Sequence, residues 1–153
     1  MLATKKCRVL FVCIGNSCRS AMAESIARRD ASDVIEPSSA GLFPLGYVAE
    51  PTQQTLLANG YPVESLSSKP LRRDAMEDAD LIVNLSGQSL ARQFYVVFDA
   101  TGRAHLAPPI EDWRVADPYG EDPATYQRIL EEIQSRVLLL AARLRAEHGS
   151  ENP

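Results

Sequence analysis

Residues 8–24 read RVLFVCIGNSCRSAMAE, and this stretch decides the fold that the sequence predicts. Residues 8–12 (RVLFV) are mostly apolar and β-branched, which is typical of a buried strand. A short loop, CIGNSC, follows the strand. Residues 19–30 then place Met22, Ile26 and several alanines on one face of a helix. The stretch therefore predicts a strand, a tight loop and a helix in succession.

The rest of the chain continues this alternation of strand and helix patterns. Strands that alternate with helices predict a parallel sheet covered on both faces, which is the α/β class. No repeat, low-complexity tract or linker interrupts the chain, so we expect a single domain over 1–153 with a core of about 7–146 and a frayed tail after Glu147. The further elements that we expect are strands from Val34 to SSAG (38–41), at 80–85 and at 110–113, helices at 49–59, from Ser86–Gly87 through Leu90 and from Pro123 onward, and a hairpin around 100–102.

Composition restricts the functional classes. The chain has 153 residues, 45% of them hydrophobic, a formal net charge of −4 and three cysteines. No apolar run reaches the ~18 residues that a membrane-spanning helix needs, and the first residues do not form a secretory leader pattern. An acidic chain with an odd number of cysteines fits neither a nucleic-acid-binding protein nor a disulfide-bonded secreted protein. We therefore expect a cytoplasmic protein without a nucleic-acid or membrane partner.

The loop CIGNSCRS carries the strongest chemical signal. The start of a helix leaves backbone N–H groups unpaired, and the helix dipole adds positive charge there. Gly15 and Asn16 tolerate left-handed backbone, so the loop can turn further N–H groups inward as a nest for a tetrahedral oxyanion. The same cup favours the thiolate of Cys13, and the planar fork of Arg19 can grip two oxygens of the anion. Ser20 is placed to donate its hydroxyl to the Cys13 sulfur.

A second candidate residue precedes the last helix. Displacing an alkoxide or phenolate from phosphorus needs a proton donor opposite the nucleophile. Asp117, in the loop RVADPYGEDP (114–123), is one such carboxyl group, although an Asp-Pro pair commonly only starts a turn. Competing carboxyl groups lie close by in the sequence, at Glu111, Asp112, Glu121 and Asp122.

With these residues assembled, the chain resembles the low-molecular-weight protein tyrosine phosphatase superfamily, which includes the thioredoxin-linked arsenate reductases. The resemblance runs over about residues 8–144 and rests on VLFVCIGNSCRSAMAE, SSAG, ADLIV and DPYG. It implies a four-stranded parallel sheet with helices on both faces and a phosphate-binding loop between the first strand and the first helix. It also implies that Cys13 is the attacking thiolate, Arg19 the phosphate clamp and Asp117 the general acid.

The resemblance assigns further residues around the anion. It implies that Ser39, with Asn16, holds the loop in its strained shape, and that Cys18 can form a reversible protective disulfide with Cys13. The residues that it implies for substrate binding are those of the loop and one aromatic residue at its mouth: Ile14, Gly15, Asn16, Ser17, Cys18, Ser20 and Tyr119.

The two branches of the superfamily differ in what they need from the chain. NSCRSAMAE and LIVNLSG resemble the reductase branch, but Ser86 stands where that branch carries its second redox cysteine, and no cysteine follows Cys18. A disulfide relay across three cysteines is therefore excluded. On the phosphatase side, Tyr119 alone remains of the family's tyrosine pair, and Phe43 or Tyr47 is the candidate for the aromatic wall of the cleft.

The sequence thus predicts a phosphomonoester hydrolase that acts on phosphotyrosine in proteins through a cysteinyl-phosphate intermediate. The alternative is an arsenate reductase that uses Cys13 and an external low-molecular-weight thiol. A non-catalytic anion-binding domain is disfavoured, because Cys13, Arg19 and Asp117 are all present. The expected partners are a phosphorylated protein or small phosphomonoester, with phosphate or arsenate in the loop. We expect no cofactor, and no metal, since His, Cys and carboxylates do not cluster with metal-site spacing.

Overall fold

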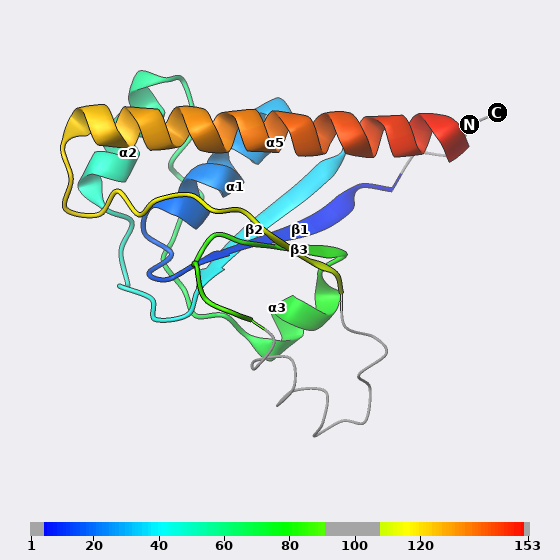
Figure 1. The fold of residues 1–153 in the computed structure, drawn as a ribbon, viewed down its shortest axis with the longest axis horizontal. Coiled ribbons are helices and arrows are strands. Elements are labelled where there is room, and N and C mark those ends of the chain that lie inside the picture. The colour runs from blue at the N-terminus through cyan, green and yellow to red at the C-terminus, as the bar shows by residue number, and fades with distance from the viewer. Residues whose placement is uncertain (1–4, 91–107, 152–153) are drawn as a thin grey trace.

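The computed structural model describes residues 5–90 and 108–151, and it contains one sheet of four parallel strands with helices on both faces (Figure 1). The strand order is β2-β1-β3-β4, and every neighbouring pair is parallel. The predicted α/β class, the four-stranded sheet and its parallel pairing are confirmed. The elements are β1 (Cys7–Cys13), α1 (Arg19–Asp30), β2 (Ile35–Gly41), α2 (Glu50–Ala58), α3 (Arg73–Asp78), β3 (Leu81–Asn84), β4 (Ile110–Asp112) and α5 (Pro123–Glu151).

Strand β1 lies inside the sheet and packs against hydrophobic residues on both of its faces. Val9 and Phe11 belong to the larger core cluster, which α1, α2 and α5 cover, whereas Leu10 and Val12 belong to a smaller cluster with Met76 of α3. All four side chains are at most 2% exposed. Burial on both faces explains why residues 9–12 of the strand are all apolar instead of alternating.

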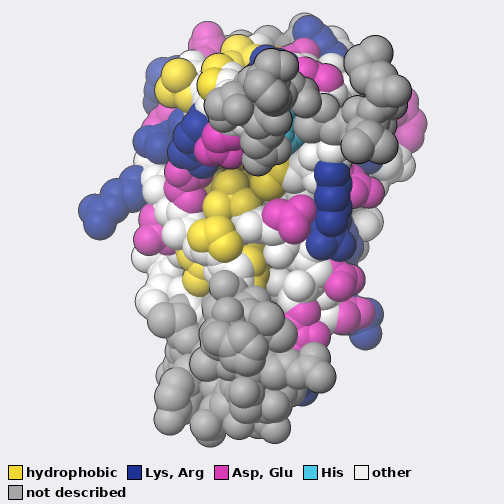
Figure 2. Space-filling view, turned by 90° about the vertical axis from the view of Figure 1, so that its right-hand side faces the viewer, with side chains coloured by type: hydrophobic (Ala, Val, Ile, Leu, Met, Phe, Trp, Pro, Cys, Tyr) yellow, Lys and Arg dark blue, Asp and Glu magenta, His cyan; other side chains and the backbone are white. Residues whose placement is uncertain are grey.

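Helix α5 covers one face of the sheet and packs against α1 and α2 (Figure 1). Figure 2 shows the side of the molecule at which the C-terminal end of α5 lies. On this side, hydrophobic side chains form a small group among acidic and basic ones. In the part of the chain that the structure describes, no helix is long and apolar enough to cross a membrane. The helix predicted from Pro123 onward is confirmed, and it buries apolar side chains spaced three and four residues apart, at Tyr126, Ile129, Leu130, Ile133, Val137, Leu140 and Leu144.

Two expectations about local structure need correction, one helix was not predicted, and one expectation lies outside the described residues. Residues 86–90 form a bend and not a short helix, because the Ser86 hydroxyl and N–H both donate to Asn84 Oδ1 and so hold the chain in a turn. Helix α5 continues to Glu151 instead of fraying after Glu147, and the sequence analysis missed α3. The expected hairpin around 100–102 lies outside the described residues.

Candidate active site

Because all four strands are parallel, their carboxyl ends lie along the same side of the sheet, and the site is built there. Strand β1 ends at Cys13, β2 at Gly41, β3 at Asn84 and β4 at Asp112. In open α/β sheets this edge is where ligands bind. The loop between β1 and α1 lies there, between the ends of β2 and β3.

The carbonyl groups of this loop point outward and are bound by the segment that follows β2. The carbonyls of Cys13, Ile14 and Gly15 accept hydrogen bonds from the N–H groups of Leu42, Phe43 and Leu45, and that of Ser17 from the N–H of Ala49, at 2.8–3.2 Å. By contrast, none of the N–H groups of residues 14–18 donates a hydrogen bond to any residue that the structure describes. The loop is therefore a cup of unpaired N–H donors, as an oxyanion site requires.

The tight shape of the loop depends on two backbone positions. Asn16 has a φ of 48°, in the left-handed region that Asn tolerates better than most residues. Gly41, the end of the SSAG segment, lies against the loop, because a Cβ there would come within 2.8 Å of the Asn16 nitrogen and the Ile14 carbonyl oxygen. Only glycine allows β2 to approach the loop this closely.

A buried hydrogen-bond network supports the predicted nucleophile from behind. Cys13 Sγ lies 2.9 Å from Ser20 Oγ, and Asn16 Nδ2 donates to Ser20 Oγ at 2.7 Å and to Ser39 Oγ at 3.0 Å. The Ser39 hydroxyl donates in turn to the carboxylate of Glu24. The Ser20 hydroxyl, held by Asn16, is thus oriented to donate to the sulfur, which stabilises a thiolate at Cys13.

Arg19 is held in place by backbone carbonyls from two other segments. Its Nη1 donates to the carbonyl of Leu85 at 2.7 Å and to that of Val115 at 3.1 Å. Its side chain is 6% exposed, and its buried Nε has no hydrogen-bond partner among the described residues. An unpaired buried N–H is costly, and the edge formed by Nε and Nη2 matches two oxygens of a tetrahedral anion.

The cup opens into a cavity of about 260 Å³ that Cys13, Arg19 and the loop residues line. Asp117 lies at its mouth with a half-exposed side chain, where Oδ2 is 3.6 Å from Arg19 Nη2 and Oδ1 accepts the N–H of Tyr119. Three apolar or aromatic side chains also line it, at Phe43, Leu45 and Tyr119. The cavity therefore has an anion-binding floor, a carboxyl group at its mouth and apolar walls.

Cys18 lines the same cavity, but its environment differs from that of Cys13. Its Sγ lies 3.6 Å from the hydroxyl of Tyr126, and burial raises the pKa of the Cys18 thiol. Burial likewise raises the pKa of the Tyr126 phenol, with the contact to Cys18 as the second cause. Cys18 is therefore a protonated thiol at neutral pH. All three cysteines are free thiols in the structure.

Of the residues implied for substrate binding, five line the cavity and two lie behind it. Ile14, Gly15, Ser17, Cys18 and Tyr119 line the cavity, whereas Asn16 and Ser20 belong to the buried network beneath Cys13. Three of the four competing carboxyl groups are engaged elsewhere, since Glu111 pairs with Arg143, Asp112 accepts from Asn84, and Asp122 accepts from Thr125 at the start of α5. The fourth, Glu121, is exposed and does not line the cavity. Among the described residues, no group of three or more His, Cys, Asp or Glu is placed to hold a metal ion.

Several contributors to the site were missed by the sequence analysis. Ser68 donates to the carbonyl of Gly15 at 2.8 Å, and the Lys69 N–H donates to Asn16 Oδ1 at 3.0 Å. Glu24 anchors the buried network, and the carbonyls of Leu85 and Val115 fix Arg19. Backbone carbonyls carry no side-chain signal, so no sequence pattern could have found these last two.

Comparison with known proteins agrees with this geometry. The family model for low molecular weight phosphotyrosine protein phosphatase matches residues 8–150. The probable low molecular weight protein-tyrosine-phosphatase EpsP of Ralstonia nicotianae is 31% identical over 140 residues, covering 90% of this chain and 96% of the relative. The protein-arginine-phosphatase of Bacillus subtilis is 32% identical over 150 residues, covering 91% and 97%.

Among solved structures, an arsenate reductase in its phosphate-binding state superposes with a TM-score of 0.76 at 26% identity, covering 90% of this chain and 98% of the other. Relatives of the chain are thus named both as phosphatases and as arsenate reductases, which are cysteine-dependent enzymes. The family match over nearly the whole chain and the two relatives above 30% identity show that the chain belongs to the low molecular weight phosphotyrosine protein phosphatase family.

Proposed function

We propose that this protein is a phosphomonoester hydrolase that removes phosphate from phosphotyrosine in proteins through a cysteinyl-phosphate intermediate. The observation that carries the proposal is the cup itself: among the described residues, the N–H groups of 14–18 and the Nε of Arg19 have no hydrogen-bond acceptor, and Cys13 lines the cavity into which the cup opens. Such preorganised donors stabilise the charge that the equatorial oxygens of a phosphoryl group carry in the transition state.

In the first step the Cys13 thiolate forms a bond to phosphorus while the bond from phosphorus to the leaving oxygen breaks. The carboxyl group of Asp117 lies at the mouth of the cavity and gives its proton to the departing oxygen. In the second step a water molecule attacks phosphorus and the Asp117 carboxylate takes the water proton. The S–P bond breaks, phosphate leaves, and the Ser20 hydroxyl stabilises the returning thiolate.

The choice of phosphotyrosine is supported by the walls of the cavity. Phe43 is 69% exposed and Tyr119 is 51% exposed, and both flank the opening with Leu45. Exposed aromatic side chains at a cavity mouth are suited to stack on a flat phenyl ring. Phosphoarginine offers these walls less apolar surface than a phenyl ring, because its planar guanidine group is polar and sits on a flexible stem, although a relative at 32% identity is named a protein-arginine-phosphatase.

Arsenate reduction is the alternative, since other relatives carry that name. It would begin with attack of Cys13 on arsenate and would need a low-molecular-weight thiol from outside. Ser86 cannot replace this thiol, because its hydroxyl is buried and donates to Asn84 Oδ1 at 2.6 Å. We also propose a reducing, cytoplasmic setting, because all three cysteines are free thiols.

The test is turnover of p-nitrophenyl phosphate, a phosphotyrosine peptide and a phosphoarginine protein, beside thiol-coupled arsenate reduction on the same preparation. We expect hydrolysis of the first two substrates, loss of all activity in Cys13→Ser, and little arsenate reduction. Faster turnover of phosphoarginine than of phosphotyrosine would overturn the substrate assignment. Arsenate reduction that exceeds hydrolysis, or hydrolysis that survives in Cys13→Ser, would overturn the mechanism.

A further inference from the structure

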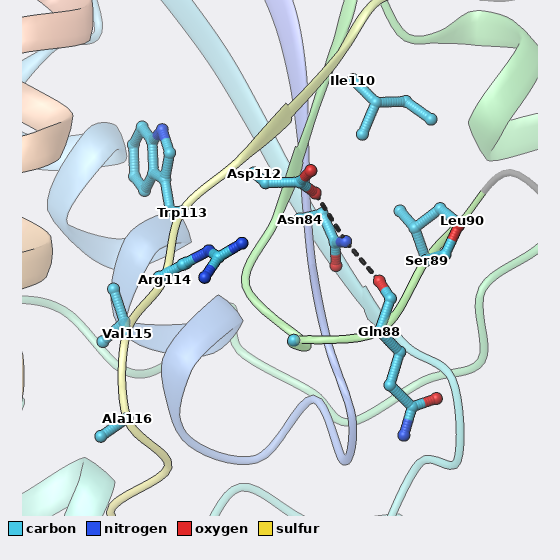
Figure 3. Close-up of a pocket in the computed structure, with 11 residues that line it drawn as sticks. Asn84, Gln88, Ser89, Leu90, Ile110, Asp112, Trp113, Arg114, Val115 and Ala116 are labelled. Carbon is cyan, nitrogen blue, oxygen red and sulfur yellow. Dashed lines mark hydrogen bonds between the residues drawn. The ribbon is translucent and has the colours of Figure 1, made fainter.

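A second and larger cavity, of about 770 Å³, lies beside the active site at the same edge of the sheet. It opens between residues 84–90, which follow β3, and residues 110–116, which include β4 and the segment after it (Figure 3). We call it the flank cavity. Its volume is within the ~300–1,000 Å³ of ligand-binding clefts. No step of the proposed hydrolysis uses it.

The flank cavity and the active site share their walls. The two carbonyls that hold Arg19 Nη1 belong to Leu85 and Val115, one from each segment that borders the flank cavity. Ala116 lines the flank cavity and the next residue, Asp117, lines the active site. A chain whose phosphorylated residue lies in the active site can therefore reach the flank cavity with a neighbouring residue.

The flank cavity contains a cationic side chain without a partner. The exposed side chain of Arg114 points from the segment after β4 into the cavity (Figure 3). Its guanidinium makes no hydrogen bond or ion pair to any residue that the structure describes, whereas the carboxylate of Glu111, three residues earlier, pairs with Arg143 outside the cavity. Arg114 is thus available for an anionic group.

The other charged group of the flank cavity is Asp112. Its Oδ1 accepts a hydrogen bond from Asn84 Nδ2 at 2.9 Å, and Asn84 Nδ2 also donates to the carbonyl of Gln88 (Figure 3). Asp112 is therefore tied to the end of β3 and is not within ion-pair distance of Arg114. Its negative charge nevertheless repels an incoming anion, so removal of this charge should strengthen the binding of an anionic group.

We propose that the flank cavity is a second substrate subsite, in which Arg114 binds an acidic side chain next to the phosphorylated residue of the substrate protein. This inference rests on the proposed hydrolysis and adds a sequence preference to it. Leu90 and Ile110 supply apolar surface for the stem of that side chain. A small phosphomonoester has no flanking residues and does not use the subsite.

The experiment compares two phosphotyrosine peptides that differ only in carrying glutamate or glutamine beside the phosphotyrosine, with p-nitrophenyl phosphate as a substrate that lacks flanking residues. For the wild-type protein we expect kcat/KM about two- to fivefold higher for the acidic peptide, mainly through KM, as suits one exposed ion pair. The preference should shrink toward one at high ionic strength.

Four variants assign the preference to the flank cavity. Arg114→Gln should bring the ratio of the two peptides close to one, and Arg114→Glu should invert it, while both turn over p-nitrophenyl phosphate like the wild type. Asp112→Asn should increase the ratio, because the amide still accepts from Asn84 but no longer repels the acid. Arg145→Gln removes the same charge beside Asp33, at the far end of α5, and should leave the ratio unchanged.

The outcomes separate this inference from the proposed function. If the wild type hydrolyses both peptides and p-nitrophenyl phosphate but the peptide ratio is one, or if Arg114→Gln keeps the wild-type ratio, the subsite is refuted and the hydrolase stands. If none of the three substrates is hydrolysed, the proposed function itself falls. A ratio that drops equally in Arg114→Gln and Arg145→Gln would show a general effect of net charge and would also refute the subsite.

Discussion

The hydroxyl groups of Tyr47 and Tyr119 lie 3.1 Å apart and join two loops at the mouth of the active site. Tyr47 comes from the segment after β2, and Tyr119 from the loop that carries Asp117. The contact raises the pKa of the Tyr119 phenol, so the Tyr119 hydroxyl remains neutral and hydrogen-bonded at neutral pH. It holds one aromatic wall beside the carboxyl group of Asp117.

Removing either hydroxyl should therefore make the aromatic side chain of Tyr119 less well ordered, and it should leave the loop that binds the anion unchanged. For Tyr47→Phe and Tyr119→Phe we expect KM for a phosphotyrosine peptide to rise about two- to fivefold, consistent with the loss of one exposed hydrogen bond. Turnover of p-nitrophenyl phosphate should change less. Because both variants remove the same contact, the double variant should be no worse than either single one. Additive losses would show that the two hydroxyls act independently.

Asn16 combines a left-handed backbone with three side-chain hydrogen bonds, to Ser20, Ser39 and the N–H of Lys69. Asn16→Gly keeps the backbone conformation and loses the hydrogen bonds, for which we expect a loss of about 1–3 kcal/mol in the free energy of unfolding. Asn16→Ala adds the cost of a Cβ at positive φ, about 1 kcal/mol more. Urea denaturation measures both. If the alanine variant is the more stable, backbone strain at this position is not significant.

Glu111 should make the stability of the protein depend on pH in the acid range. Arg143 donates to its carboxylate and, as the main cause, lowers the pKa of Glu111 below its ordinary value of about 4.3. A lowered pKa in the folded state means that the stabilisation is complete above about pH 4.3 and is lost as the pH falls through the folded-state pKa.

The corresponding measurement is the free energy of unfolding of the wild type and of Glu111→Gln between pH 7 and about pH 3. The wild type should lose more stability over this range than Glu111→Gln. Glu132→Gln, which removes an exposed carboxylate paired with Arg136 one turn along α5, is the matched control and should keep the wild-type slope. Equal slopes in all three proteins would show that the pair with Arg143 contributes nothing.

The parts of the fold that the sequence predicted are those with a strong local pattern. Residues 9–12 of β1 form a continuous apolar run, and α5 has apolar residues three and four apart over many turns, so both elements are evident without knowledge of their partners. Helix α3 (RDAMED) was not predicted, because it has only six residues and buries only Met76. The bend at 86–90 was predicted as a helix, because the sequence does not show that the Ser86 hydroxyl bonds to Asn84 and so competes with helix formation.

In the candidate site, too, residues within one local motif were predictable, and residues that reach the site from distant segments were not. Cys13 and Arg19 stand six residues apart at the two ends of one loop, so the motif itself predicts a shared anion site. Asp117 needed a family resemblance, because an Asp-Pro pair in a loop does not show which residue it will face. Ser68 and Lys69 reach the loop from a distant segment through single hydrogen bonds, and only the folded chain shows these contacts.

Asp117→Asn tests the proposed proton donor. An amide cannot protonate the leaving oxygen, so we expect kcat for a phosphotyrosine peptide to fall about 10²–10³-fold. The fall should be smaller for p-nitrophenyl phosphate, whose leaving group is a weaker base and needs a proton less. Glu121→Gln changes an exposed carboxylate in the same loop and should have little effect. An equal fall with both leaving groups would indicate that Asp117 positions Arg19, 3.6 Å away, and donates no proton.

Cys18→Ser tests whether the second thiol of the cavity protects the first. Peroxide converts the Cys13 thiolate to a sulfenic acid and releases water or hydroxide, and the Cys18 thiol can then condense with it to a disulfide and water. Burial raises the pKa of Cys18, so Cys13 should be the thiol that peroxide attacks first. Treatment with a dithiol should restore most activity of the oxidised wild type but little of the oxidised Cys18→Ser, whose Cys13 proceeds to the irreversible sulfinic acid. Cys7→Ser, at the opposite end of β1, should recover like the wild type; equal recovery in Cys18→Ser would exclude a protective disulfide.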